Sequence, residues 1–339
     1  MNVQAQTARL PRLGALTSRL PDEFGVLVAL GVIVAVIAIP HPTFVQPFNL
    51  FQIIGSSAFY GMIALGMVFL LALGEIDLSV GWNFNFSAVI TAEAMTHGID
   101  PWFSAILGVL FGAGLGLGNG ILVVGLQLPA IIITLGTYSM FQGLSLVVNR
   151  SQPVVPPDTI TSTSFFDFTS ATFVDNVIPV VALIFAGLAV LLHLVLHRTR
   201  FGYRVQAIGS NPEAARLTGL PIAWTKVQAL VLVGAICGLS GALFVGFRGA
   251  IDPETGGTFI LTVVAAAIIG GTPLSGGSGT VIGALVGTLI IACISSGIIF
   301  FGIDATWSTF VTGAVIVVAV AIDRVVRAQR TKRIRGGGA

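Results

Sequence analysis

The sequence predicts an all-α polytopic membrane protein with about ten transmembrane helices. Hydrophobic residues make up 55% of the 339-residue chain and charged residues only 9%, whereas roughly 25% of the residues in a soluble domain are charged. Apolar runs long enough to cross a bilayer, which takes about 20 helical residues, recur along the whole chain. The runs do not alternate with polar residues, and this excludes a transmembrane β-barrel.

Glycine, proline, tryptophan or charged residues interrupt the apolar runs and mark the helix boundaries. The predicted spans are Phe24–Ile39, Asn49–Leu73, Val80–Met95, Trp102–Leu126, Pro129–Val148, Val177–Leu196, Thr225–Phe247, Phe259–Gly270, Thr280–Phe301 and Ala305–Ile322. The chain then divides into an N-terminal cytoplasmic tail at residues 1–23, a single transmembrane domain at 24–323 and a basic cytoplasmic tail at 324–339.

Basic residues predict the orientation, because Lys and Arg accumulate in cytoplasmic loops. With ten spans and a cytoplasmic N-terminus, all of the 16 Lys and Arg residues except Arg150 and Arg248 fall on the cytoplasmic side. The C-terminus is then cytoplasmic too, and the positive-inside effect explains the basic tail without a nucleic-acid partner. Tryptophans favour the headgroup boundary, and these lie at predicted span ends: Trp82, Trp102, Trp224 and Trp307.

Glycines spaced four residues apart predict where helices pack closely, because they place small residues on one helix face. They form three sets, Gly112 with Gly116 and Gly120, Gly234 with Gly238, and Gly283 with Gly287. Packing explains these glycines fully, and no chemistry is assigned to them.

The loop at residues 197–226 is the most informative segment outside the spans. Within it, residues 207–220 predict one short helix with both ends marked. Asn211 suits the N-cap, Pro212 the first helical position and Gly219 the C-terminal end. Such a helix is either a docking site for a partner or an ordinary helix on the membrane surface, and these residues alone leave both open.

Ionisable residues at membrane depth are costly and therefore suggest function. Glu75 and Asp77 stand between two apolar runs and beside glycines, a pattern typical of a broken helix that lines a cavity. A carboxylate there either binds a solute hydroxyl or fixes the loop through backbone amides, and the second reading is favoured. Ser79 is likewise favoured as a helix cap. Residues 270–277 repeat the Gly, Leu, Ser and Gly of residues 74–81 and predict a second break.

Polar side chains form stripes on the third and fifth predicted spans. In lipid, such stripes face the bundle interior, either as helix contacts or as the wall of a polar path. Contacts are favoured for the third span and a path for the fifth, where an aromatic ring beside hydroxyl and amide groups suits a sugar. The residues predicted to line a translocation path are Asp77, Ser79, Asn83, Thr134, Tyr138, Phe141 and Gln142.

Catalytic and metal sites are not predicted. His193 and His197 are four residues apart and could present two imidazoles to a metal, but no third ligand is evident, which favours interfacial solvation. Cys237 and Cys293 lie inside apolar runs and are predicted to be packing residues.

Several motifs resemble those of the permease subunits of bacterial ABC importers, the inner-membrane component family of binding-protein-dependent transport systems. Residues 213–219 are similar to the Glu-Ala-Ala…Gly coupling segment that docks into the ATPase subunit. Residues 74–81 resemble the Gly-Gly-Ile-Asp-Leu-Ser-Val-Gly motif of the ribose-type (monosaccharide) branch and depart from it at Glu75. Further similar stretches are residues 118–124, 128–129, 134–137, 199–202 and 270–277, so that the resemblance runs from about Asn49 to Asp323.

The resemblance implies an importer permease of the bacterial cytoplasmic (inner) membrane that translocates a small polar solute, a monosaccharide or related sugar, by alternating access. It implies an ABC ATPase subunit, a second permease copy or paralogue, and a periplasmic or lipid-anchored solute-binding protein as partners, besides membrane lipid. The implied ATPase-coupling residues are Asn211, Pro212, Glu213, Ala214, Ala215, Arg216 and Gly219.

The chain's own residues agree that ATP is hydrolysed elsewhere. Its lysines, Lys226 and Lys332, do not lie in a phosphate-binding Gly-x-x-x-x-Gly-Lys loop. The chain is therefore not expected to be an enzyme or to hold a cofactor, and ATP and Mg are expected on the partner ATPase. The alternatives are an ion-coupled secondary transporter or channel, a membrane-embedded enzyme and, within the ABC importers, a branched-chain amino acid permease.

Overall fold

The computed structural model describes residues 23–304, 306–307, 309–311, 313–314 and 317. Each predicted span between Phe24 and Phe301 coincides with one helix to within a few residues. The tenth predicted span, Ala305–Ile322, and the predicted tails lie wholly or largely outside the described residues. The main helices are α1 (Glu23–Ala38), α2 (Pro47–Ala72), α3 (Val80–Thr96), α4 (Pro101–Leu126), α5 (Ala130–Val148), α8 (Val180–Arg198), α9 (Arg200–Ser210), α11 (Ile222–Arg248), α12 (Phe259–Ile269) and α13 (Val281–Phe300).

Short elements fill the connections between these helices. They are η3 (Pro42–Val45), α6 (Asp158–Thr161), α7 (Ser164–Ser170), β1 (Thr172–Phe173), β2 (Ile178–Pro179), α10 (Pro212–Leu217) and η4 (Thr255–Thr258). The strands β1 and β2 form a small antiparallel hairpin in which Thr172 pairs with Pro179.

Among the described residues, six helices are long and apolar enough to cross a membrane, namely α2, α4, α5, α8, α11 and α13. The apolar helices α1, α3 and α12 are shorter, and the eleven residues of α12 rise only about 16 Å, half of the hydrocarbon thickness. The described residues thus bear out a helical membrane protein, and the total of ten spans remains a prediction.

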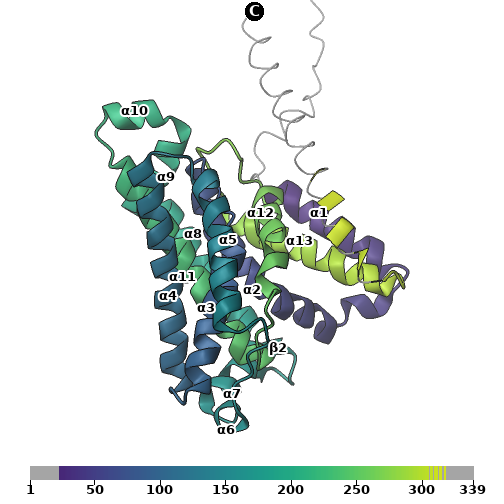
Figure 1. Cartoon of the computed structure of the whole chain (residues 1–339). Helices are drawn as coiled ribbons and strands as arrows, with labels where there is room; N and C mark the ends of the chain where they lie inside the picture. Colours follow the sequence, from purple (N-terminus) through teal and green to yellow (C-terminus); the bar gives the residue numbers. More distant parts are fainter. Residues whose placement is uncertain (1–22, 305, 308, 312, 315–316, 318–339) are drawn as a thin grey trace, which may run out of the picture.

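The bundle has two distinct ends (Figure 1). One end carries α9 and α10 together with Arg198, Arg200 and Arg204, and it is called the basic end. The other carries α6, α7 and the β1–β2 hairpin and is called the α7 end. The basic side chains were expected on the cytoplasmic side, so the basic end is the expected cytoplasmic face.

Helix α2 is the centre of the bundle and α5 lies at its periphery. In the most apolar stretch of α2, 83% of the residues are buried, compared with 22% for α5. Helix α2 packs against α8, α11, α12 and α13. Helix α5 contacts its neighbours through one face, which carries Thr134, Phe141 and Ser145.

The predicted glycine contacts join α4 to α11, which run antiparallel. A Cβ atom on Gly112 would lie 2.5 Å from the carbonyl oxygen of Gly234, and one on Gly238 would lie 2.4 Å from that of Gly108. Real Cβ atoms do not approach so closely, so only glycine permits this backbone contact. In the same way, a Cβ atom on Gly287 would lie 2.1 Å from the carbonyl oxygen of Ala266.

This contact makes a prediction about stability. We expect Gly112→Leu to lower the free energy of unfolding by about 3 kcal/mol, because the side chain must push α4 away from α11. Gly114→Leu is the matched control, since a Cβ atom at Gly114 meets no atom within 4 Å. Thermal denaturation followed by size-exclusion chromatography measures the difference, and equal losses for both variants would contradict the packing assignment.

Both breaks that the sequence predicts are present, and the structure adds a third that the sequence did not predict. Residues 74–79 and 270–280 are non-helical, as predicted, but both connect helices at the basic end. The third break lies at residues 249–258, where the backbone carbonyl of Asp252 accepts a hydrogen bond from Asn85 Nδ2 at 3.0 Å. A Cβ atom on Gly256 would lie 2.1 Å from the carbonyl oxygen of Gly81, so this loop enters the bundle beside α3 before α12 begins.

Trp82 also departs from the prediction. Trp102, Trp224 and Trp307 are exposed, as expected for headgroup-level rings, but Trp82 is only 2% exposed. It lies in an apolar cluster with Phe86, Phe141 and Ile260. The first turn of α3 is covered by α5 and by the loop before α12, so a tryptophan at this helix start does not reach the membrane boundary.

Candidate functional site

Helix α10 has the capped ends that the sequence predicts. The Asn211 side chain accepts a hydrogen bond from the Ala214 amide at 3.0 Å, and Pro212 occupies the first turn. Gly219 adopts φ +76°, and the Leu220 amide then closes the helix by donating to the Ala215 carbonyl at 3.0 Å. A left-handed residue at this position is the usual reason for glycine.

The helix is shorter than the predicted segment 207–220. Residues 207–210 belong to the end of α9, and the chain bends at Asn211, which is extended. Proline disfavours the helical conformation of the residue before it, and this separates the two helices at Asn211.

Helix α10 presents almost all of its side chains to the outside. Glu213, Ala214 and Arg216 are exposed, and only Ala215 is buried against the bundle. Leu217 is 80% exposed at the C-terminal end. Figure 1 shows α10 beyond the ends of the long helices. A capped helix that carries charges and one exposed leucine, held away from the bundle, has the form of a docking element.

An ion pair fixes the loop between α2 and α3 to the starts of two other helices. Lys226 Nζ in the first turns of α11 contacts Glu75 Oε1. The other carboxylate oxygen, Oε2, accepts a hydrogen bond at 2.9 Å from the amide of Ala130, where α5 begins. Glu75 is 12% exposed and Lys226 is 27% exposed, so the pair is partly shielded from water.

Asp77 and Ser79 extend this network to α4. Asp77 Oδ1 accepts hydrogen bonds from the Ser79 amide at 2.7 Å and from Ser79 Oγ at 2.6 Å. Asn119 on α4 donates to Ser79 Oγ at 2.8 Å, and Thr134 on α5 accepts from the Leu78 amide at 3.0 Å. The buried carboxylate of Asp77 thus bonds within its own loop, which is the structural role that the sequence favoured.

The loops with the repeated glycine pattern meet beneath α9. The Gly277 amide donates to the Ala72 carbonyl at 2.9 Å. A Cβ atom on Gly276 would lie 2.9 Å from the Gly74 amide nitrogen and 3.0 Å from the Gly209 carbonyl oxygen. The C-terminal end of α9, which leads into α10, therefore packs directly on both loops.

The predicted path residues separate into two groups. Asn83 Nδ2 donates to the Gly112 carbonyl at 3.2 Å, so Asn83, like Ser79 and Thr134, bonds to a neighbouring element, whereas Asp77 bonds to Ser79 within its own loop. The other three lie further along α5: Tyr138 packs edge-on against Trp82 with ring centroids 6.1 Å apart, Phe141 belongs to the same cluster and Gln142 is half-buried.

Trp82 adds an unexpected polar atom to that cluster. Its Nε1 is buried and has no hydrogen-bond partner among the residues that the structure describes. Sequence analysis missed Trp82, Asn119 and the Glu75 partner Lys226 as site residues. Glu75 itself carried a signal, because it departs from the motif that the rest of its loop follows.

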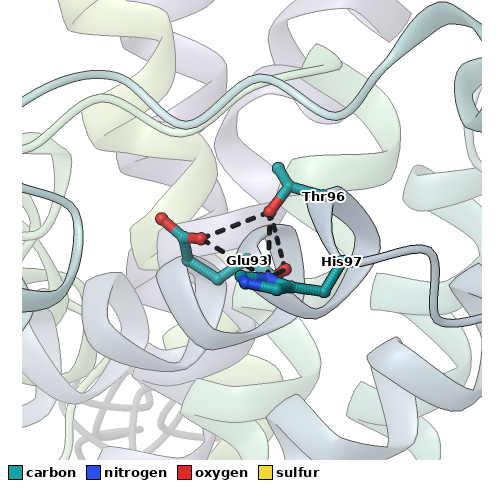
Figure 2. A network of polar contacts seen from close by, with 3 residues as sticks. All are labelled: Glu93, Thr96 and His97. Carbon is teal, nitrogen blue, oxygen red and sulfur yellow. Dashed lines mark hydrogen bonds and ion pairs between the residues drawn. The ribbon is translucent and has the colours of Figure 1, made fainter.

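Glu93 lies near the C-terminal end of α3, and its polar contacts among the described residues are with Thr96 and His97 (Figure 2). Thr96 Oγ1 donates to the Glu93 carbonyl at 2.8 Å, and His97 Nδ1 lies 2.8 Å from the same oxygen. The Glu93 carboxylate is 3.2 Å from Thr96 Oγ1 and 4.0 Å from His97 Nδ1. These contacts cap the end of α3 outside the middle of the bundle.

Comparison with known proteins identifies the family to which this chain belongs. The model of the family described as "Branched-chain amino acid transport system / permease component" matches residues 49–320. The chain belongs to this permease family. It is a multi-pass protein of the inner membrane, in agreement with its six long apolar helices.

Several relatives of this permease are permeases of sugar transport systems. It is 34% identical to the ribose import permease of Bacillus subtilis, over 89% of this chain and 93% of the relative. It is 33% identical to the D-allose transport system permease of Escherichia coli (90% and 92%), and 31% identical to the L-arabinose ABC transporter permease of Azospirillum brasilense (92% and 90%).

The fold has a counterpart among solved structures. One chain, solved in an inward-facing conformation and described as a metal-chelate type ABC transporter, matches with a TM-score of 0.51 over 88% of this permease and 97% of that chain. The sequences are only 15% identical, so this likeness concerns the fold alone. The resemblance predicted from the motifs is confirmed by the family and by the relatives.

Proposed function

We propose that this permease is the transmembrane subunit of an ATP-driven importer, with α10 as the helix that receives movement from a separate ATPase subunit. The exposed, doubly capped α10 is the observation that carries the proposal. Its exposed coupling residues are Asn211, Pro212, Glu213, Ala214, Arg216 and Gly219, together with Leu217, while the coupling residue Ala215 packs α10 against the bundle.

Movement of α10 has a direct mechanical route into the bundle. Helix α9 connects α10 to the loops at 74–79 and 270–280, whose backbones it contacts. The first of these loops is tied by Glu75 to the starts of α5 and α11. A shift of α10 therefore changes the position of α5, the most peripheral of the six long helices, and alternates access to a path beside it.

The solute proposed is a monosaccharide or a related sugar. Aromatic faces together with hydroxyl, amide and indole N–H groups bind the alternating apolar and hydroxyl surfaces of a sugar ring. Trp82, Tyr138, Phe141 and Gln142 supply such groups on α3 and α5. The ribose, allose and arabinose relatives support this class over the branched-chain amino acids in the family description.

The complete importer would contain a second permease copy or paralogue, a pair of ATPase subunits and a periplasmic or lipid-anchored binding protein that delivers the sugar. ATP and Mg would bind to the ATPase. In this assembly the basic end faces the cytoplasm, as the positive-inside effect requires.

Copurification tests the proposal. A tagged permease isolated from its native membrane should carry an ATPase subunit in near-stoichiometric amount. We expect Leu217→Glu to reduce that amount about tenfold, because docking then buries a charge in place of an apolar side chain.

Phe173→Glu is the control for this loss. Phe173 is also an exposed apolar side chain, but it lies in the hairpin at the α7 end. It should leave the ATPase yield unchanged. Recovery of the wild-type permease without an ATPase would contradict the proposal, and equal losses from both variants would contradict the role of α10.

A further inference from the structure

The corner between α8 and α9 contains a cationic hollow that the importer mechanism does not use. Its volume is about 470 Å³. The residues that define it, here called the α8–α9 hollow, are His197, Arg198, Arg200, Tyr203, Arg204 and Leu220. Three arginines thus line one space at the corner between α8 and α9.

The arginines of the hollow form no ion pair with the part of the chain that the structure describes. Among the described residues, no carboxylate lies within 4 Å of the guanidinium groups of Arg198, Arg200 or Arg204. His197 adds a ring that contacts the His193 carbonyl through Nδ1 at 3.0 Å. Three guanidinium groups without an acidic partner favour an anionic ligand with several acceptor oxygens, such as a phosphate.

The corner is rigid, so these side chains start from fixed backbone positions. Thr199 Oγ1 donates to the Val195 carbonyl at 2.6 Å and accepts from the Gly202 amide at 3.2 Å. Gln206 Nε2 donates to the Leu196 carbonyl at 3.1 Å. A Cβ atom at Gly202 would lie 2.1 Å from the Leu196 carbonyl oxygen, so the two helices touch backbone to backbone.

An exposed apolar face leads directly to the hollow. Leu183, Val190, Leu191 and Leu194 on α8 are each about half-exposed. Leu194 is three and four residues before His197 and Arg198, so these side chains follow one another on the same face of the helix. An apolar stripe that ends in cations has the polarity of a phospholipid, with acyl chains beside α8 and a charged headgroup at its end.

We propose that the α8–α9 hollow binds the phosphate headgroup of an anionic phospholipid from the leaflet at the basic end, with an acyl chain along the exposed face of α8. The lipid would hold the N-terminal end of α9 at the membrane boundary, and thereby the helix that leads to α10. A zwitterionic phospholipid would bind less well, because its ammonium group meets the same arginines.

Lipid binding to the full-length permease tests this site independently of transport. The purified protein is titrated in detergent with phosphatidylglycerol and with phosphatidylcholine, and bound lipid is counted by native mass spectrometry. We expect preferential retention of phosphatidylglycerol, and an affinity that falls about tenfold or more in Arg200→Gln/Arg204→Gln. Arg200→Lys/Arg204→Lys should retain most of the binding, because it keeps the charge.

Arg150→Gln/Arg248→Gln is the control, because it removes the same charge at the α7 end and should leave the affinity unchanged. Equal losses in the two glutamine variants, or equal retention of both lipids by the wild type, would overturn the site. Displacement of the lipid by millimolar glycerol phosphate would show that a free phosphate suffices and would overturn the lipid assignment. Unchanged lipid affinity combined with loss of a copurifying ATPase would instead assign the arginines to the protein interface.

Discussion

Replacement of Gly219 by valine is expected to reduce sugar uptake roughly tenfold while the permease still inserts and purifies normally. Gly219 has φ +76°, and a non-glycine residue in this region costs about 1–2 kcal/mol, which corresponds to a factor of 5–30 in a population. The conformational free-energy cost of a positive φ is larger for a β-branched residue such as valine than for most other residues. This free-energy cost destabilises the C-terminal cap of α10, so a smaller fraction of the molecules has α10 in the conformation that docks on the ATPase.

Two control variants separate this effect from mere bulk. Gly219→Asn should retain most of the uptake, because asparagine tolerates the left-handed conformation. Gly125→Val places the same side chain near the end of α4, where a Cβ atom meets nothing within 4 Å, and it should be close to the wild type. Normal uptake by Gly219→Val would remove α10 from the coupling mechanism.

Lys226→Met is expected to lower the free energy of unfolding by about 2–3 kcal/mol and to impair transport. The substitution leaves the Glu75 carboxylate, which is 12% exposed, without its cation. Removal of one partner from a shielded ion pair is costly because the remaining charge stays desolvated. The connection of the α2–α3 loop to α11 is lost at the same time.

A double-mutant cycle measures the pair itself. In Glu75→Gln/Lys226→Met the amide oxygen can still accept from the Ala130 amide, so most of the stability should return and the coupling free energy should be about 1–3 kcal/mol. Glu93→Gln is the control, because Glu93 contacts only Thr96 and His97 of its own helix end, and it should change stability by less than about 0.5 kcal/mol. Additive effects of Glu75→Gln and Lys226→Met would contradict the contact.

The sequence predicted the helices well because apolar length and local breakers determine them. Between residues 23 and 301, each predicted span coincides with one helix to within a few residues. The caps of α10 at Asn211 and Gly219 were predictable for the same reason, since each acts on its own backbone neighbours. The glycine contact between α4 and α11 was predicted as a close approach, although the sequence did not name the partner helix.

Contacts between distant segments were not predictable from one sequence. Glu75 and Lys226 are 151 positions apart, and only the fold brings them together. The loops at 74–79 and 270–280 were compared for their similar residues, but their meeting beneath Gly209 depends on how α2, α9 and α12 pack. The interruption at 249–258 was missed because the short apolar run of α12 was read as a whole span.

Trp82 shows how a local rule fails. Its position at a helix start suggested the membrane boundary, but α5 covers that start and buries the indole. The polar stripe on the third span had been assigned to helix contacts, and the hydrogen bond from Asn83 to Gly112 agrees with this. The path along α5 stays a prediction.

Uptake into proteoliposomes shows whether this permease imports a sugar with energy from a partner ATPase. These contain the native complex and internal ATP, and labelled pentoses and hexoses are supplied outside with the binding protein. We expect uptake that requires internal ATP and is unaffected when ionophores collapse the ion gradients. Uptake that persists without ATP and stops with the ionophores would contradict ATP-driven import and assign the chain to the ion-coupled transporters.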